Sequence, residues 1–439
     1  MRATIRACYL SLSLCIVAVN ARAQGQMGHV LDAVGPVNQS MAGAGTALPL
    51  DAMGALHWNP ASISGLPGSE IGFGFMGFAP ETELASRVDA GAFGPGMPAV
   101  TMQGVTKSDT DIVPIPSLAC VYRNPASPWT IGLGGVAIGG FGVDFPASNV
   151  NPILTPQPAD GGIGFGAIYS QFQLLQFCPT VSYRMSNGWS IGVAPTFNWA
   201  TLAIAPFSAA TPNADGSYPS GAHGDASWGM GIQVGTFYEW QATGWNFGLS
   251  YKSPQWFQDF ELNGMDELGN PRRLTLDLDY PGIFSMGVAY RGIPRVNLAW
   301  DIRYIDYENA DGFQEAGYDV TGAVTGFGWS SIWTTSLGAE FAVTDNLRWR
   351  CGYAFNESPI SNPEMFYNSP APALVQHHLS TGFTYQVASG WTCSVAYHHG
   401  FQNSISGRWW HPTFGSVPGT NVTGTLATHG LVGGISKRF

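Results

Sequence analysis

Between Ser69 and the C-terminus, the sequence is divided into stretches in which large apolar residues alternate with small or polar ones. In the stretch 226–240, Trp228, Met230 and Ile232 would share one face of a strand, because successive side chains of a strand point to opposite sides. We count fourteen such stretches: 69–78, 112–123, 129–143, 171–186, 188–206, 226–240, 244–258, 282–291, 294–309, 330–342, 346–354, 376–386, 390–399 and 428–439. The pattern predicts an all-β fold, but a soluble sandwich with its apolar face inward would show the same alternation.

The intervals between these stretches alternate strictly between short and long. The short ones lie at 124–128, 187, 241–243, 292–293, 344–346 and around 389, and the long ones at 79–111, 144–170, 207–225, 259–281, 310–329, 355–375 and 400–427. An up-and-down membrane barrel with short periplasmic turns and long outer loops produces this rhythm and an even number of strands. We therefore expect a transmembrane antiparallel up-and-down β-barrel of about 14 strands.

The composition agrees with a membrane barrel. Charged residues make up 11% of the chain, against a usual ~25%, while aromatic residues make up 13%. No run of 18 or more apolar residues occurs, so no transmembrane helix is predicted. Without Arg2, Arg6 and Arg22 of the N-terminus, 15 basic residues (18 − 3) face 29 acidic ones, a formal charge of −14. Such an acidic chain is not expected to bind nucleic acid.

Two segments precede the first strand. Residues 1–23 have a basic start, a short apolar stretch and the small residues Ala21 and Ala23, as in a secretory signal peptide. Residues 24–68 are rich in Gly, Ala and polar residues and are too short to form an independent domain. We expect them to fill the barrel as an N-terminal hatch (plug), with residues 69–439 forming the barrel.

Residues 24–68 also carry a resemblance. Met41-Ala42-Gly43-Ala44-Gly45, then Asp51-Ala52, then Trp58-Asn59-Pro60-Ala61 resemble the hatch of the FadL/TodX family of outer-membrane transporters. The resemblance implies a monomeric barrel in the outer membrane of a Gram-negative bacterium, surrounded by lipid and lipopolysaccharide. It also implies passive uptake of a hydrophobic small molecule, with no cofactor. The terminal Phe439 resembles the signal that the barrel-assembly machinery reads.

The resemblance implies three groups of site residues. Asn59, Pro60 and Ala61 would hold or gate the hatch. A lateral opening in the wall would lie at Gly139 and Gly140, because glycine weakens a strand and often marks a bulge; alternatively, these glycines make room for the hatch. Exposed apolar side chains of an outer loop would capture the ligand, unless they only pack the loop: Ile153, Leu154, Phe165 and Ile168.

The identity of the ligand stays open between two classes. The stretch 201–207, where fatty-acid transporters of this family place basic residues, carries no charge here. A buried carboxylate without a cation is costly, so a neutral aromatic or alkane hydrocarbon stands beside a long-chain fatty acid. Arg348 and Arg350 point inward and could bind a carboxylate, or could pair with lumen acids such as Glu340.

Other functions are less well supported by the sequence. No nucleophile with a base and an orienting group is recognisable, so we do not expect an enzyme. No metal site is predicted: of His377-His378 and His398-His399, at most one residue of each pair can meet across neighbouring strands, more in keeping with a polar lumen than with a metal ligand. A general porin or a surface adhesin or receptor barrel remains the alternative to a hydrophobe channel.

Overall fold

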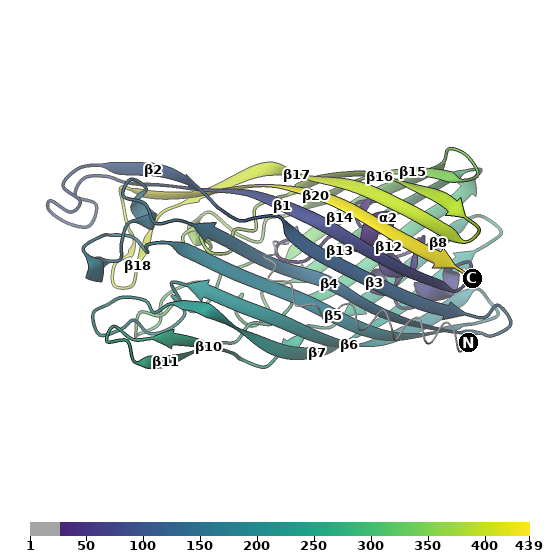
Figure 1. The fold of residues 1–439 in the computed structure, drawn as a ribbon, viewed down its shortest axis with the longest axis horizontal. Coiled ribbons are helices and arrows are strands. Elements are labelled where there is room, and N and C mark those ends of the chain that lie inside the picture. Colours follow the sequence, from purple (N-terminus) through teal and green to yellow (C-terminus); the bar gives the residue numbers. More distant parts are fainter. Residues whose placement is uncertain (1–26) are drawn as a thin grey trace.

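The chain folds into a closed antiparallel barrel of fourteen strands, with an inner segment enclosed by it (Figure 1). The computed structural model describes residues 27–439, so the predicted signal peptide lies outside the described residues. Each barrel strand pairs with the next along the chain, and the last strand pairs with the first from Glu70↔Arg438 to Val88↔Thr420. The barrel strands are β1 (Glu70–Val88), β3 (Val113–Arg123), β4 (Trp129–Phe145), β5 (Ile168–Arg184), β6 (Trp189–Ala205), β7 (Gly221–Trp240), β8 (Trp245–Lys252), β12 (Gly282–Ile293), β13 (Val296–Asp306), β14 (Ile332–Ala342), β15 (Leu347–Asn356), β16 (His377–Ala388), β17 (Trp391–Gly407) and β20 (Thr420–Arg438). The predicted fold class and strand number are confirmed.

The long connections hold more structure than the sequence pattern predicted. The interval 79–111 is only partly loop, because β1 runs on to Val88 and pairs there with β2 (Met102–Lys107). The interval 259–281 contains a hairpin of β10 (Phe260–Met265) and β11 (Pro271–Leu276). The remaining short elements are β9 (Trp256–Phe257), β18 (Trp410–His411), β19 (Gly415–Ser416), η1 (Ser62–Gly65), η2 (Pro152–Leu154), η3 (Pro158–Asp160) and η4 (Pro363–Met365). Figure 1 places β2, β10, β11 and β18 at one end of the barrel, opposite the C-terminus.

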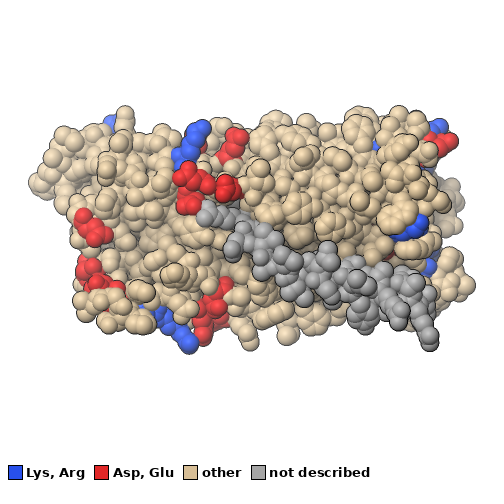
Figure 2. Space-filling view, viewed as in Figure 1, with Lys and Arg blue, Asp and Glu red and all other residues tan. Residues whose placement is uncertain are grey.

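The outer surface of the barrel is apolar. On β7, the side chains of Trp228, Met230 and Ile232 are 58%, 63% and 43% exposed, whereas the side chains between them face the interior. Figure 2 shows charged side chains towards the two ends of the molecule and an uncharged band between them. An outward apolar belt is what a lipid-facing barrel requires and is the opposite of a soluble sandwich.

Residues 27–68, which we call the lumen segment, are enclosed by the strands, and nearly every side chain is buried. The segment contains α2 (Gly35–Gln39), which has Pro36 in its first turn, and α3 (Ala52–Trp58), whose N-cap Asp51 accepts a hydrogen bond from the Gly54 amide at 3.1 Å. Pro at a first turn and Asp at an N-cap are favourable helix starts. Among residues 27–439, no helix is both long and apolar enough to cross a membrane.

Candidate functional site

A cluster of aromatic rings occupies the barrel interior on the side of the long loops. His29 of the lumen segment lies at its centre, stacked on Phe313 with ring centroids 4.9 Å apart. Further rings lie 5.3–5.9 Å from His29 or pack behind these neighbours. The aromatic cluster consists of Phe141, Phe172, Tyr280, Tyr307, Phe313, Phe327 and Trp329 around His29.

The aromatic cluster carries no charge. Burial lowers the pKa of His29 to about 3, so its imidazole is neutral at physiological pH. Neither ring nitrogen has a hydrogen-bond partner within residues 27–439. The hydroxyls of Tyr280 and Tyr307 donate to backbone carbonyls of Ile138 and Met27, at 3.3 and 2.6 Å. The polar atoms of these tyrosines are therefore satisfied by backbone, and the rings surround His29 with apolar surface.

Beside the aromatic cluster, the barrel wall is incomplete. The β3–β4 ladder ends at Ser117↔Val136, although β4 continues to Phe145 and β3 begins at Val113. The register of β4 on β5 shifts between Ala137 and Gly139, which marks a bulge. At the far side, the Asp109 amide donates to the Asp144 carbonyl at 2.8 Å. Between these two limits, β3 and β4 are not paired with each other.

The lumen segment closes this wall gap. Val30 forms a β-bridge with Gly139, the Leu31 amide donates to the Ile138 carbonyl at 2.9 Å, and the Gly140 amide donates to the His29 carbonyl at 2.9 Å. A Cβ on Gly139 would lie 2.6 Å from that His29 carbonyl oxygen, so glycine permits the close approach. The predicted position of the interruption thus coincides with a bulge and with the place where the lumen segment meets β4.

A cavity lies among the outer loops. It has a volume of about 250 Å³, and the described residues that line it include Asp277 and Asp311 but no Lys, Arg or His. Burial raises the pKa of Asp277, with the nearby Asp311 and Asp259 carboxylates adding to the effect. A cavity of about 150 Å³ is enough for benzene. Its apolar lining consists of Ile204, Phe207, Leu276, Val324, Phe327 and Tyr367.

The four loop residues predicted to capture the ligand are not exposed as expected. Ile153, Leu154 and Ile168 are buried, and Phe165 is half-buried with its ring 5.5 Å from that of Phe366. The Ile153 amide donates to Ser86 Oγ at 2.9 Å, which fixes η2 against β1. The expected exposure is wrong for these side chains, which form the core on which the outer loops fold, as in the alternative in which they only pack the loop. Their part in ligand capture stays a prediction.

Asn59 anchors the lumen segment to the wall. Its Nδ2 donates to the Thr46 carbonyl at 2.9 Å and to the Thr236 carbonyl of β7 at 3.0 Å, and its Oδ1 accepts from the Ala61 amide at 3.0 Å. A Cβ on Gly235 of β7 would lie 2.1 Å from Asn59 Oδ1. Asn59, Pro60 and Ala61 therefore form a fixed turn against β6 and β7, and the sequence alone left its contacts undetermined.

A buried ion pair forms a further anchor that the sequence did not reveal. Asp301 Oδ2 accepts from the amides of Gly45 and Thr46 at 2.8 and 2.9 Å and from Arg303 Nη2 at 2.7 Å. Arg303 also donates to the Gly43 carbonyl at 2.8 Å and lies 3.5 Å above the Trp58 ring. Both charged side chains are fully buried. In the sequence, the only indication of this pair is that Asp301 and Arg303 are two residues apart and so share the inward face of β13.

Arg348 and Arg350 lie at the end of the barrel that carries the short turns, away from the predicted capture loop. They line a cavity of about 340 Å³ together with Glu70, Glu340 and Arg438, among others. Arg350 Nη2 pairs with Glu340 Oε2 at 2.6 Å, and Arg348 Nη1 lies 3.5 Å from Glu340 Oε1. The arrangement matches the alternative in which these arginines pair with a lumen acid.

Comparison with known proteins gives one family. The family model described as outer membrane protein transport protein (OMPP1/FadL/TodX) matches residues 14–407. The long-chain fatty acid transport proteins of Escherichia coli K12 and Shigella flexneri are each 25% identical to this chain over 264 residues, covering 50% of it. The match spans 58% of the length of these curated relatives.

Solved structures with the same fold include channels for aromatic compounds. The Pseudomonas putida toluene transporter TodX is 16% identical, with a TM-score of 0.67 covering 93% of this chain and 99% of that one. The Ralstonia pickettii toluene transporter TbuX gives a TM-score of 0.64 at 16% identity with the same coverage, 93% and 99%. A Pseudomonas aeruginosa FadL homologue also gives 0.64, at 13% identity, covering 93% and 98%. At these identities the likeness establishes the fold.

Proposed function

This chain belongs to the outer membrane protein transport protein family (OMPP1/FadL/TodX), and on that premise we propose that it is a channel for passive uptake of neutral hydrophobic small molecules, of the size of a monoaromatic hydrocarbon. The single observation that carries the proposal is the uncharged aromatic cluster beside the wall gap. A neutral ring gains from burial against other rings, whereas a carboxylate there would lie among apolar surfaces with no cation.

The proposed path has three stages. The ligand enters the cavity of about 250 Å³ among the outer loops and passes inward past Phe327, which belongs both to that cavity and to the aromatic cluster. It then displaces His29 from among the rings. It leaves sideways when Val30 and Leu31 release β4 at Gly139 and Gly140, so that the gap between β3 and β4 opens.

In this proposal the lumen segment, with the rest of residues 24–68, acts as the hatch. Asn59 and the Asp301–Arg303 pair hold its middle part against β7 and β13, while the hydrogen bonds at residues 29–31 are the part that releases. The filled lumen argues against a general porin. A monomer set in lipid and lipopolysaccharide and inserted by the barrel-assembly machinery suits the exposed apolar belt and Phe439, which is 66% exposed.

A long-chain fatty acid is the second candidate, favoured by the 25% identity to long-chain fatty acid transport proteins. Its carboxylate would need a cation. Arg350 is engaged by Glu340, whereas the Arg348 side chain is 47% exposed in the cavity at the turn end of the barrel. A fatty acid bound there would have passed the lumen segment and would not need the wall gap.

Uptake of labelled toluene and of labelled oleate tests the proposal, in cells that lack their own hydrophobe channel, with and without this protein. We expect faster uptake of toluene and unchanged uptake of oleate. Faster oleate uptake that is lost in Arg348→Gln would establish the fatty-acid role instead. If a correctly inserted barrel changed neither rate, the transport proposal would be wrong.

A further inference from the structure

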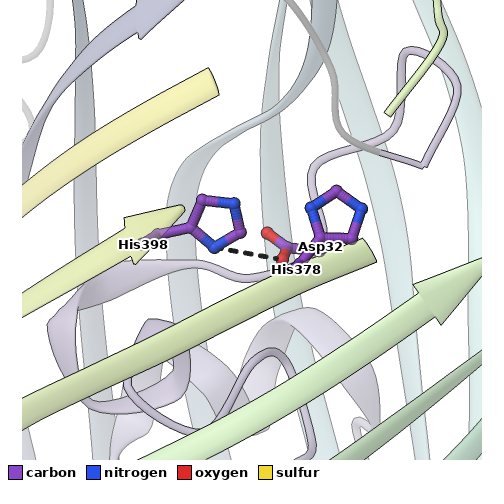
Figure 3. A group of neighbouring side chains, drawn as sticks. All are labelled: Asp32, His378 and His398. Atoms are coloured by element: carbon purple, nitrogen blue, oxygen red, sulfur yellow. Dashed lines mark ion pairs between the residues drawn. The ribbon is translucent and has the colours of Figure 1, made fainter. Parts of the chain in front are cut away.

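Three buried side chains from distant parts of the chain meet inside the barrel (Figure 3). Asp32 comes from the lumen segment, His378 from β16 and His398 from β17. Each is at most 1% exposed. One potential ligand atom of each lies within 4.8 Å of the other two, and His398 Nδ1 lies 3.7 Å from Asp32 Oδ2. Figure 3 shows the Asp32 carboxylate between the two rings.

The strand register brings the two imidazoles together. Ser380 of β16 is opposite His398 of β17, so His378, two residues before Ser380, lies on the same face and diagonally across from His398. The ring centroids are 5.4 Å apart. Asp32 is positioned by its neighbour Leu31, whose amide is bonded to Ile138 at the edge of the wall gap.

The protonation state of His378 follows from its surroundings. Asn356 Nδ2 donates to the carbonyls of Glu357 and Val375 at 2.9 and 3.0 Å, which fixes the orientation of the amide. Asn356 Oδ1 then accepts from His378 Nε2 at 2.8 Å. In a neutral ring the proton is on Nε2, so Nδ1 carries a lone pair. Within the described part of the chain, this buried Nδ1 has no hydrogen-bond partner.

His398 also presents a lone pair. Gln39 Nε2 lies 3.0 Å from His398 Nδ1, and an amide nitrogen can only donate, so Nδ1 accepts. The same Gln39 nitrogen donates to Asp32 Oδ1 at 3.3 Å, and Ser380 Oγ lies 3.0 Å from His398 Nδ1. The Nδ1 lone pair of His398 accepts from Gln39, and an ion bound there would take the place of that donor. All three side chains are fully buried, with one ligand atom of each within 4.8 Å of the others.

We propose that Asp32, His378 and His398 bind a divalent transition-metal ion of the zinc class, which fastens the lumen segment to β16 and β17. Zinc takes His and Asp ligands at about 2.0–2.2 Å in a tetrahedral arrangement, which places ligand atoms about 3.4 Å apart. The 3.7 Å separation of His398 Nδ1 and Asp32 Oδ2 is close to this value. Imidazole ligands select zinc, copper or nickel over calcium and magnesium.

The surroundings of the three ligands suit such a site. A metal-bound histidine commonly donates its other N–H to a carbonyl or carboxylate, which orients the ring. Asn356 does this for His378. Gln39 Nε2 and Ser380 Oγ each lie 3.0 Å from His398 Nδ1, and both would turn away from this lone pair when the ion binds. The sequence could not show the set, because its carboxylate lies in the lumen segment, far along the chain from both histidines.

Metal content after zinc loading tests the proposal on the full-length barrel, purified from outer membranes in detergent and stripped with a chelator. Dialysis against Zn²⁺ and then against metal-free buffer should leave about one zinc ion per chain. His398→Asn and Asp32→Asn should lose it. The matched control is His399→Asn, since His399 is the next residue of β17, faces the other side and contacts His429. Loss of zinc in the control, or retention in His398→Asn, would overturn the site.

A second measurement does not depend on the folding of the ligand variants. Stripped wild-type protein titrated with Co²⁺ should develop the visible absorption of a tetrahedral complex, complete at one equivalent and abolished by Zn²⁺. Asn356→Leu keeps all three ligands and removes the acceptor behind His378, so it should weaken zinc binding by about 10–100-fold. A wild-type barrel that takes up neither Zn²⁺ nor Co²⁺ stoichiometrically would rule out the metal site, whatever the result of the uptake experiment.

Discussion

The two ends of the barrel interior are built from different chemistry. Towards the long loops, the aromatic cluster packs ring against ring without a charge. From the middle of the barrel to the short turns, charged side chains meet in pairs, and Arg184, Arg303 and Arg438 of these pairs also donate to carbonyls of the lumen segment. These pairs are Asp301–Arg303, Glu340–Arg350, Glu239–Arg184 and Glu70–Arg438.

The difference explains why a sideways exit suits a neutral ligand. A hydrocarbon that continued along the barrel axis would have to separate hydrogen-bonded ion pairs, each costly to break when buried. The wall gap lies beside the aromatic cluster, before those pairs begin. In the proposed path, the ligand meets only the apolar part of the interior, while the charged pairs hold the lumen segment beyond the exit.

Replacing Arg303, the cation of the buried pair, should have the largest effect on the charged part of the interior. In Arg303→Met, Asp301 stays buried without its cation, and the Gly43 carbonyl loses its donor. We expect a loss of about 3–5 kcal/mol in the free energy of unfolding, measured by urea unfolding in detergent. Arg273→Met is the control, because the exposed Arg273–Glu261 pair should contribute less than about 1 kcal/mol. Equal losses in both variants would contradict the anchoring role.

Raising the pH from 5 to 8 should lower the free energy of unfolding through Asp51. Burial raises the pKa of Asp51 to about 7, and the Glu70 carboxylate adds to the effect while Arg350 and Arg438 oppose it. Because the folded pKa lies above the unfolded one, the stabilisation is complete at low pH and is lost as the pH rises through about 7. Between pH 5 and 8 the free energy of unfolding should fall by roughly 2 kcal/mol from this group.

The Asp51→Asn variant isolates this effect, since asparagine caps a helix about as well as aspartate. The variant should lose about 2 kcal/mol less than the wild type between pH 5 and 8. The comparison uses urea midpoints at both values. If the urea midpoints of the wild type and the variant change equally between pH 5 and 8, Asp51 is already ionised in the folded protein at pH 5.

The smallest expected effect concerns the hydrogen bonds between the lumen segment and β4, beside the aromatic cluster. Leu31→Pro removes the amide that donates to Ile138, one of two hydrogen bonds that hold the lumen segment to β4. A hydrogen bond contributes about 1 kcal/mol, so toluene uptake should rise about fivefold. Leu31→Ala keeps the amide and serves as the control. If both variants transport at the same rate, the hydrogen bonds at the wall gap do not limit uptake.

The sequence predicted the membrane-embedded part of the fold well, because its signals are local. Alternation on β7 and the short interval before β8 are visible within a few residues. The outer part of β1, from Glu83 to Val88, was missed because it pairs with β2 and needs no apolar outer face. The β10–β11 hairpin was not predicted either, because it too needs no apolar outer face.

The site was predictable only where a local pattern marked it. The paired glycines Gly139 and Gly140 indicated an interruption in β4, but not that residues 29–31 of the lumen segment lie against them. Asp301 and Arg303 appeared only as polar positions on β13, because their partners come from Gly43 to Thr46. Ile153 and Leu154 were expected to be exposed, since sequence shows apolar character and not the loop core that buries it.

The bridge of Val30 to Gly139 bears on how a barrel wall can open while its strands stay paired. A barrel that opened by parting two of its own strands would lose a ladder and expose two sheet edges. Here residues 29–31 of the lumen segment lie along the unpaired part of β4, held by two hydrogen bonds worth about 1–3 kcal/mol together. The proposed opening would therefore leave all fourteen strands paired, so that release of the ligand would not reduce the stability of the barrel.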